Sequence, residues 1–230
     1  MCILFDNTKL KMIIPENIRK IYTLWYSERR KKAIEKFMNN VTGEKILDIG
    51  SGKGIFNKIF RKVGFKKIFA VDFNRKLLKM NDADKRFILN LENKLPFSNN
   101  SFDCCFAAEI LEHLENREQL LNEIHRILKK GGYLILTTPN KDSLIAKFDR
   151  IIGRFIVDGL WNGHDYSHKY VYSFNEIVKL IKEVGFKILK LESFYLFYRF
   201  PILTKSSSGM CTWILAQKIA KEVVQLCPEG

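Results

Sequence analysis

Cysteine is scarce in this sequence, and long apolar runs are missing. Five cysteines occur in 230 residues and none forms a Cys-x-x-Cys pair, which excludes a disulfide-rich miniprotein and a zinc ribbon. The most apolar run, residues 194–203, is interrupted by Arg199 and is too short to span a bilayer, so no transmembrane segment is expected. Polar Asp6, Asn7 and Lys9 stand where a secretory leader is apolar. These absences predict a protein of the reducing cytoplasm.

Acidic residues are outnumbered. The chain carries 39 Lys and Arg against 25 Asp and Glu, a net charge of +14. A nucleic-acid or anionic-membrane partner is one explanation for this excess. The other is a genome that favours Lys, Ile and Asn, because the basic residues are spread along the chain with one denser cluster at residues 29–32. Net charge alone does not distinguish between these two explanations.

Short apolar strands alternate with helical patterns through most of the chain. Strands are expected at residues 45–49, 67–71, 86–89, 102–108 and 133–138, and helices at 55–63, 75–80, 117–128 and 174–184. The third helix is expected to end at a glycine stop, residues 129–132. Two last strands, 186–196 and 210–217, form an antiparallel hairpin at the sheet edge. The pattern predicts an α/β, Rossmann-like fold: a seven-stranded, mostly parallel sheet with helices on both faces.

One domain is expected over residues 1–230, because no linker or internal repeat divides the chain. Residues 1–43 are expected to form an N-terminal helical cap, with apolar residues at helical spacing between Arg and Lys. Residues 139–173 are expected to be an insertion that builds the lid over the substrate. The aromatic residues of this insertion suit an apolar or ring-bearing acceptor.

A glycine-rich loop follows the first strand, where residues 48–54 read Asp-Ile-Gly-Ser-Gly-Lys-Gly. Glycine lets a backbone approach a ligand closely. A phosphate-binding P-loop is excluded, because Leu47 stands at its first glycine and Gly54 follows the lysine. A dinucleotide fingerprint is weakened, since Ile55 occupies its last small position.

Asp48-x-Gly50-x-Gly52-x-Gly54 resembles the first motif of the class I S-adenosylmethionine-dependent methyltransferases. A carboxylate under the loop suits this cofactor, which carries a sulfonium and an ammonium and no phosphate, whereas it would repel a pyrophosphate. The resemblance implies that the loop contributes five cofactor-binding residues: Asp48, Gly50, Ser51, Gly52 and Gly54.

The resemblance continues along the chain. Asp72 ends the second strand, where the family's acid accepts hydrogen bonds from the ribose hydroxyls, and Phe73 follows it. Residues 90–103 resemble the segment between the third and fourth strands of small-molecule methyltransferases, which places Asn90 at the adenine amino group and Leu91 against the adenine face. Residues 127–140 resemble the family's next helix and fifth strand.

The candidate catalytic residues follow the fourth strand. Glu109, Glu112 and His113 have helical i, i+3, i+4 spacing and are expected to share one face. In one interpretation Glu109 lines the cofactor pocket and His113 is a general base. In the other they hold a divalent metal with His168, because Glu-x-x-Glu-His resembles the metal-binding stretch of ubiquinone-biosynthesis O-methyltransferases and of small-RNA 3′-end 2′-O-methyltransferases. His168 also remains a catalytic candidate without metal.

The sequence predicts a methyltransferase that transfers a methyl group from S-adenosylmethionine to oxygen of a small-molecule, lipid or sugar acceptor, by in-line displacement with His113 as base. The first alternative is a metal-assisted RNA 2′-O-methyltransferase. The second is a non-catalytic protein that binds the cofactor as a partner of other proteins. The fold alone fixes neither the acceptor nor the methylated atom.

Overall fold

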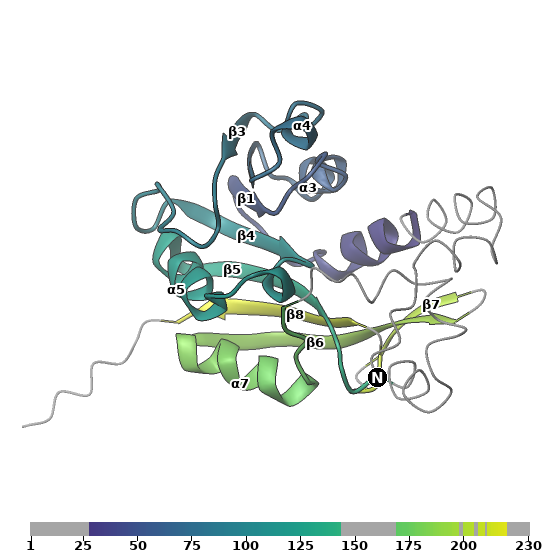
Figure 1. Cartoon of the computed structure of the whole chain (residues 1–230). Helices are drawn as coiled ribbons and strands as arrows, with labels where there is room; N and C mark the ends of the chain where they lie inside the picture. Colours follow the sequence, from purple (N-terminus) through teal and green to yellow (C-terminus); the bar gives the residue numbers. More distant parts are fainter. Residues whose placement is uncertain (1–27, 144–168, 198–199, 205–206, 210, 220–230) are drawn as a thin grey trace, which may run out of the picture.

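A computed structural model of the chain describes residues 28–143, 169–197, 200–204, 207–209 and 211–219. Eight strands form one sheet in the order β3-β2-β1-β4-β5-β8-β6-β7 (Figure 1). The strands are β1 (Lys45–Ile49), β2 (Lys67–Asp72), β3 (Lys85–Ile88), β4 (Phe102–Ala108), β5 (Leu128–Pro139), β6 (Phe186–Phe197), β7 (Phe200–Thr204) and β8 (Cys211–Lys218). The helices are one at residues 28–37, α3 (Asn57–Val63), α4 (Arg75–Leu78), the 3-10 turn η1 (Leu111–His113), α5 (Arg117–Ile127) and α7 (Phe174–Val184).

The expected fold class is confirmed. Strands β3, β2, β1, β4 and β5 pair in parallel, and β8, β6 and β7 add antiparallel pairs at one side. The strand β7 was not expected, because the apolar run 194–203 was interpreted as the end of one strand and a connection. In the structure this run folds back on itself, pairing Phe197 with Phe200 and Leu196 with Pro201. Proline is tolerated there because β7 is an edge strand.

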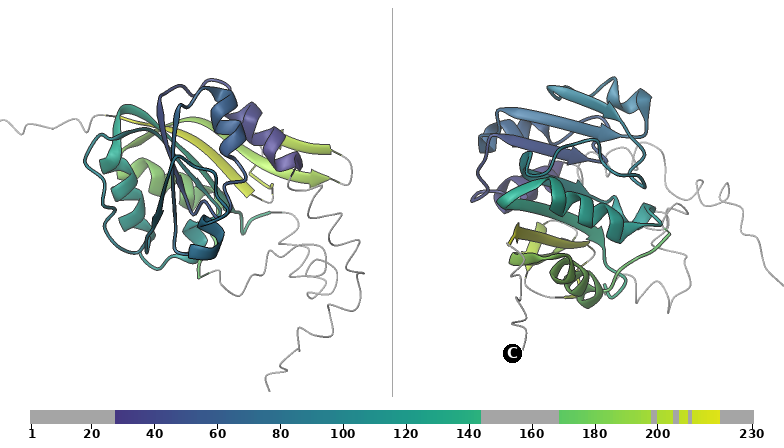
Figure 2. Two further views of the ribbon diagram at one scale, coloured as in Figure 1. Left: turned by 90° about the horizontal axis from the view of Figure 1, so that it is seen from above. Right: turned by 90° about the vertical axis from the view of Figure 1, so that its left-hand side faces the viewer.

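Helices cover both faces of the sheet, as the sequence predicts (Figure 2). One apolar cluster joins the sheet to α5 and α7, and includes Ile124 and Ile181. A second joins the opposite face to α3 and to the helix at residues 28–37, through Phe60 and Phe37. Neighbouring residues of β5 divide between them, since Leu134 belongs to the first cluster and Ile135 to the second.

The expected glycine stop after α5 is wrong. Leu128 is already extended, and β5 begins there without a connecting loop. Leu128 pairs with Phe102 and is fully buried, so the sheet takes the chain directly from the helix. Gly131, with φ +76°, lies at the irregularity in the register of β4 and β5. The glycines therefore form a bulge within the strand instead of a helix cap.

A parallel bridge joins Asn140, just after β5, to Tyr172, just before α7. The Asn140 amide also donates hydrogen bonds to the carbonyls of Ser207 (2.8 Å) and Gly209 (2.9 Å). The expected insertion 139–173 therefore leaves the sheet and returns to it at one place. Within the described ranges, no helix combines the length and apolar character that a bilayer crossing needs.

Candidate functional site

The candidate site lies where the carboxyl ends of the parallel strands meet. Parallel pairing brings the residues that follow β1, β2, β4 and β5 to the same edge of the sheet. That edge is where open α/β sheets bind ligands. It collects the glycine loop at residues 50–54, Asp72, Glu109 and Asn140.

Backbone hydrogen bonds fix the glycine loop to β2. The Gly50 and Ser51 N–H groups donate to the Val71 carbonyl at 2.9 and 3.1 Å. Gly50 and Gly54 have positive φ and no room for a side chain, because a Cβ on Gly50 would lie 2.9 Å from Ile110 Cδ1. Gly52, with φ +50°, is different: a Cβ there would meet nothing closer than Leu77 Cδ1 at 3.9 Å. The loop therefore presents Gly52 to open space that a ligand can occupy.

Two aspartates lie beneath this loop. Asp72 accepts the Gly52 N–H at Oδ2 (2.8 Å) and the Asn74 N–H at Oδ1 (2.7 Å). Asp48 is 2% exposed, and its Oδ2 has no hydrogen-bond partner among the described residues. Burial, together with the negative charge of Asp72, raises the pKa of Asp48 to about 8. A buried acid without a partner under an open loop fits a cationic ligand such as S-adenosylmethionine.

The remaining predicted cofactor residues differ in accessibility. Phe73 is 74% exposed beside Asp72, so its ring is free to contact a ligand. Asn90 is exposed, but its Oδ1 accepts the Glu92 N–H at 3.0 Å, so part of its acceptor capacity is used within its own turn. Leu91 is buried in the apolar cluster of α5 and α7.

Hydrogen bonds and an ion pair from residues that were not among the predicted site residues hold Glu109 in place. It directly follows β4 with φ +52°, an uncommon conformation for a non-glycine residue. Its N–H donates to the Thr137 carbonyl at 2.9 Å, and its Oε1 accepts the Thr137 hydroxyl at 2.6 Å. The Arg30 guanidinium, from the helix at residues 28–37, lies 3.3 Å from the same oxygen.

Glu112 is separated from Glu109 by the end of β5. Its Oε2 accepts the hydroxyl of Thr138 at 3.4 Å, and its Oε1 has no partner in the described part of the chain. Thr137 and Thr138 are adjacent in a strand, so their side chains point to opposite faces of the sheet. The carboxyl groups of Glu109 and Glu112, which accept from these two hydroxyls, therefore lie toward opposite faces. The expectation of one shared helical face is wrong, because only Leu111–His113 is helical and Glu109 precedes that turn.

Burial, followed by the charge of Glu109, raises the pKa of Glu112 to about 9. This shift favours the protonated form of Glu112. His113 ends η1, half-buried, with its N–H donating to the Ile110 carbonyl. His168 lies outside the described residues. No cluster of three His, Cys, Asp or Glu side chains suited to a metal ion occurs in the ranges that the structure covers.

Arg30 and Thr137 were missed from the sequence. No feature of the sequence marks Thr137 as a site residue, because its strand is otherwise apolar. Arg30 could have been identified, because it lies three and four residues before Ala33 and Ile34, on the apolar stripe of its helix. A charged residue on a buried helical face normally requires a partner.

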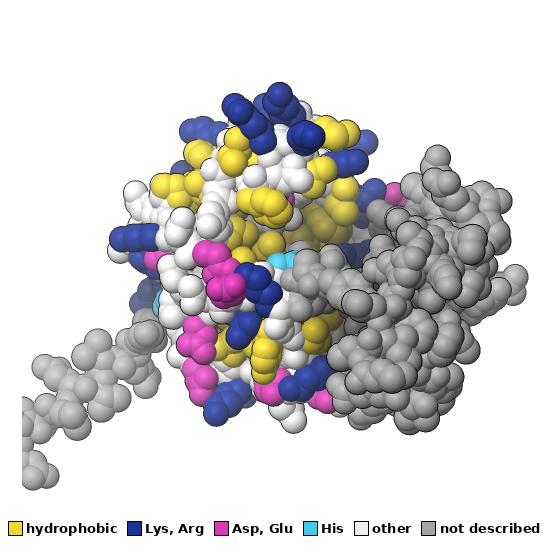
Figure 3. Space-filling view, viewed as in Figure 1, with side chains coloured by type: hydrophobic (Ala, Val, Ile, Leu, Met, Phe, Trp, Pro, Cys, Tyr) yellow, Lys and Arg dark blue, Asp and Glu magenta, His cyan; other side chains and the backbone are white. Residues whose placement is uncertain are grey.

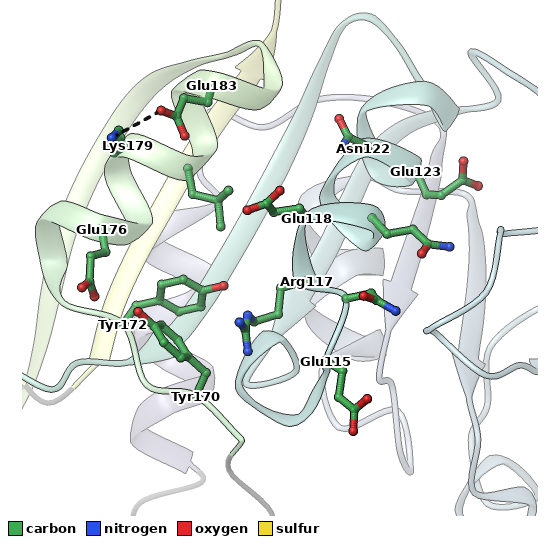
Figure 4. Close-up of a pocket in the computed structure, with 13 residues that line it drawn as sticks. Glu115, Arg117, Glu118, Asn122, Glu123, Tyr170, Tyr172, Glu176, Lys179 and Glu183 are labelled. Carbon is green, nitrogen blue, oxygen red and sulfur yellow. Dashed lines mark ion pairs between the residues drawn. The ribbon is translucent and has the colours of Figure 1, made fainter.

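A separate groove of about 720 Å³ lies between α5 and α7 (Figure 4). Arg117 enters it and lies 4.4 Å from the ring centroid of Tyr170. None of the predicted site residues lines this groove. On the face seen in Figure 3, acidic side chains gather near α5 and α7 and basic ones near β3 and α4. The groove itself carries both charges, since Arg117 and Lys179 line it together with several glutamates.

The chain matches known proteins at the level of sequence and fold. Residues 47–136 match a family model described as a methyltransferase domain. An uncharacterised protein of Methanocaldococcus jannaschii is 30% identical over 176 residues, 74% of this chain and 78% of the relative. The demethylmenaquinone methyltransferase of Thermotoga maritima is 27% identical over 188 residues, 74% and 82% of the two chains.

A solved structure shares the fold. A S-adenosylmethionine-dependent methyltransferase of Thermotoga maritima, a possible histamine N-methyltransferase, superposes with a TM-score of 0.65 and 20% identity over 86% of this chain and 95% of that one. The glycine loop, the buried acid beneath it and these similarities agree. The chain belongs to the class I S-adenosylmethionine-dependent methyltransferases.

Proposed function

We propose that this protein transfers a methyl group from S-adenosylmethionine to an oxygen atom of a small-molecule, lipid or sugar acceptor by in-line displacement. The observation that carries the proposal is the buried carboxyl group of Asp48 beneath the open Gly52, with an Oδ2 that has no hydrogen-bond partner among the described residues. When bound, S-adenosylmethionine supplies an electrophilic methyl group. The chain's own residues bind the cofactor, position the acceptor and remove its proton.

The cofactor-binding residues remain those expected from the sequence. Asp72 keeps lone pairs for ribose hydroxyls while its hydrogen bond to Gly52 fixes it. Asp48 offers a negative charge to the cationic cofactor once it ionises. The full proposed set is Asp48, Gly50, Ser51, Gly52, Gly54, Asp72, Phe73, Asn90, Leu91 and Glu109.

His113 is the proposed general base, with Glu109 and His168 as further catalytic candidates. An imidazole titrates near neutrality and suits removal of a hydroxyl proton. Support comes from its place at the end of η1, five residues after β4 ends at the carboxyl edge of the sheet. The Thermotoga relative is named for a demethylmenaquinone acceptor, so a quinol ring, which offers both ring carbons and hydroxyl oxygens, is the first acceptor class to test.

The cap 1–43 and the insertion 139–173 are part of the proposal. The helix at residues 28–37 packs on the sheet and brings Arg30 to Glu109. The insertion returns beside the site, because the Lys169 and Tyr170 N–H groups donate to the Glu112 carbonyl at 2.7 and 3.2 Å. We also propose a cytoplasmic location, supported by the free, buried thiols of Cys104, Cys105 and Cys211.

The first test is calorimetric titration with S-adenosylmethionine and S-adenosylhomocysteine. Methyl-labelled cofactor is then incubated with extract of the source cells and with demethylated quinols, with and without a chelator. Label in a lipid or small-molecule fraction, unaffected by the chelator, is the expected result. Label in RNA that disappears with the chelator would overturn the proposed acceptor class. Binding without transfer to any fraction would overturn the catalytic role.

A further inference from the structure

We infer that Arg30 is a positioning residue of the methyl-transfer site, and that it acts by holding the Glu109 carboxylate. The helix at residues 28–37 then contributes a residue to the site in addition to covering the sheet. The inference rests on the proposed function, in which Glu109 lines the cofactor pocket and borders the acceptor.

The contacts form a closed triangle. Arg30 Nη2 donates to Thr137 Oγ1 at 3.1 Å and lies 3.3 Å from Glu109 Oε1. Thr137 Oγ1 in turn donates to Glu109 Oε1 at 2.6 Å. The Thr137 hydroxyl therefore accepts a hydrogen bond from the guanidinium and donates one to the carboxylate. Charge-assisted hydrogen bonds of this kind hold a carboxylate in one orientation.

Packing restricts where the Arg30 side chain can go. The side chain is only 16% exposed, and its guanidinium carbon lies 5.8 Å from the centroid of the Phe56 ring. The helix that carries it is anchored by Ile34 and Phe37, and the Phe37 ring meets Trp213 edge-on at 5.7 Å. The guanidinium is therefore delivered from a fixed backbone, which gives the ion pair a defined geometry.

The position of Glu109 bears directly on the cofactor loop. Its left-handed backbone turns the chain out of β4 so that Ile110 packs against Gly50. Contacts thus run from Arg30 through Glu109 and Ile110 to the loop that presents Gly52. A half-buried carboxylate without its guanidinium would be free to change both its rotamer and its protonation state.

The experiment compares Arg30→Gln, Arg30→Lys, Glu109→Gln and the double variant Arg30→Gln/Glu109→Gln. Lys32→Gln is the matched control, since Lys32 is exposed on the same helix. Each protein is titrated with S-adenosylhomocysteine and assayed with methyl-labelled cofactor and source-cell extract, with kcat and the KM for the cofactor determined separately. Thermal melting shows that each variant is folded.

The expected result is that Arg30→Gln lowers transfer by roughly tenfold. Arg30→Lys keeps the charge and should restore part of the transfer, while Lys32→Gln should not change it. In the Glu109→Gln background, Arg30→Gln should have little further effect on transfer.

Two results would overturn the inference alone, provided that the wild-type protein binds cofactor. One is unchanged transfer in Arg30→Gln. The other is the same loss of transfer in both backgrounds, which would mean that Arg30 acts independently of Glu109. A wild-type protein that binds neither cofactor nor product would instead refute the proposed function, and the inference with it.

Discussion

Gly50 and Ile110 meet so closely that a Cβ atom on Gly50 would lie 2.9 Å from Ile110 Cδ1. The contact joins the cofactor loop after β1 to the residue that follows Glu109 after β4. It gives the glycines of one motif different roles, because Gly52 faces open space whereas Gly50 faces packed side chain.

Substitutions at these two glycines should therefore affect different properties, the stability of the protein at Gly50 and the binding of the cofactor at Gly52. Gly50→Ala should lower the free energy of unfolding by about 1–3 kcal/mol through overpacking. Gly52→Val should abolish binding of S-adenosylhomocysteine, because its side chain fills the ligand's space; its φ of +50° also strains a β-branched residue, so thermal melting must show that the variant is folded. Denaturant unfolding and calorimetry measure the two effects. Retained binding in folded Gly52→Val would contradict the assignment of the loop.

The affinity for S-adenosylmethionine should depend on pH through Asp48. Its pKa of about 8 leaves it protonated at neutral pH, and a bound cation favours its ionised form. Binding should therefore release a proton and strengthen as the pH rises toward 8. Calorimetry in buffers of different ionisation enthalpy measures the proton release. In Asp48→Asn the cofactor's own amino group still titrates, so the difference between the proteins isolates Asp48; equal pH profiles would exclude its role.

Glu112 should make the protein less stable as the pH rises. Its folded pKa of about 9 lies above the ordinary value of 4.5, so the native state keeps a proton that the unfolded chain releases. The free energy of unfolding should then decrease with rising pH between these two values. Glu112→Gln, which is neutral throughout, should remove most of this slope in urea unfolding. Asp48 contributes a slope of the same sign, so the comparison needs Asp48 intact in both proteins.

His113→Ala should lower methyl transfer by roughly 10²–10⁴-fold, the range for a lost acid–base group. Affinity for S-adenosylhomocysteine should change little, because the proposed role of His113 is toward the acceptor and not toward the cofactor. Transfer assays with labelled cofactor and calorimetry separate the two. Transfer at the wild-type rate would remove His113 from the mechanism.

Asp72→Ala should weaken cofactor binding and loosen the loop. Each Asp72 oxygen accepts one backbone N–H, from Gly52 and from Asn74, and neither bond can form with alanine. Losing the carboxylate also removes the acceptor for ribose hydroxyls. Asp84→Ala is a suitable control, since the Asp84 carboxylate also accepts a backbone N–H. Its donor is Ile68, at the other end of β2. Equal affinity in the two variants would contradict the role of Asp72.

Periodicity and local end signals were enough to predict most of the sheet and its helices. The boundaries of α7 agree with the prediction because both ends are encoded locally: Ser173 and Glu176 form a capping box, and Gly185 ends the helix with φ +106°. The cofactor loop could be predicted because glycine and acid spacing express a backbone requirement directly.

The missed features depend on contacts between distant segments. Nothing in residues 194–203 indicates a chain reversal, which becomes favourable only when β6 pairs with β8. The separation of Glu109 from Glu112 follows from the alternation of Thr137 and Thr138 at the end of β5, not from their own spacing. The partner of Arg30 could not be predicted from the sequence, because Thr137 lies 107 residues away along the chain.

The bridge between Asn140 and Tyr172 closes the insertion at its base. With its two ends fixed to β5 and α7, the segment between them can gain, lose or exchange residues with little effect on the sheet, because the entropy of closing a loop grows only slowly with its length. In the proposed function, in which this segment covers the acceptor, acceptor choice and fold stability are under separate control, and a related enzyme could acquire a new substrate by replacing this one segment.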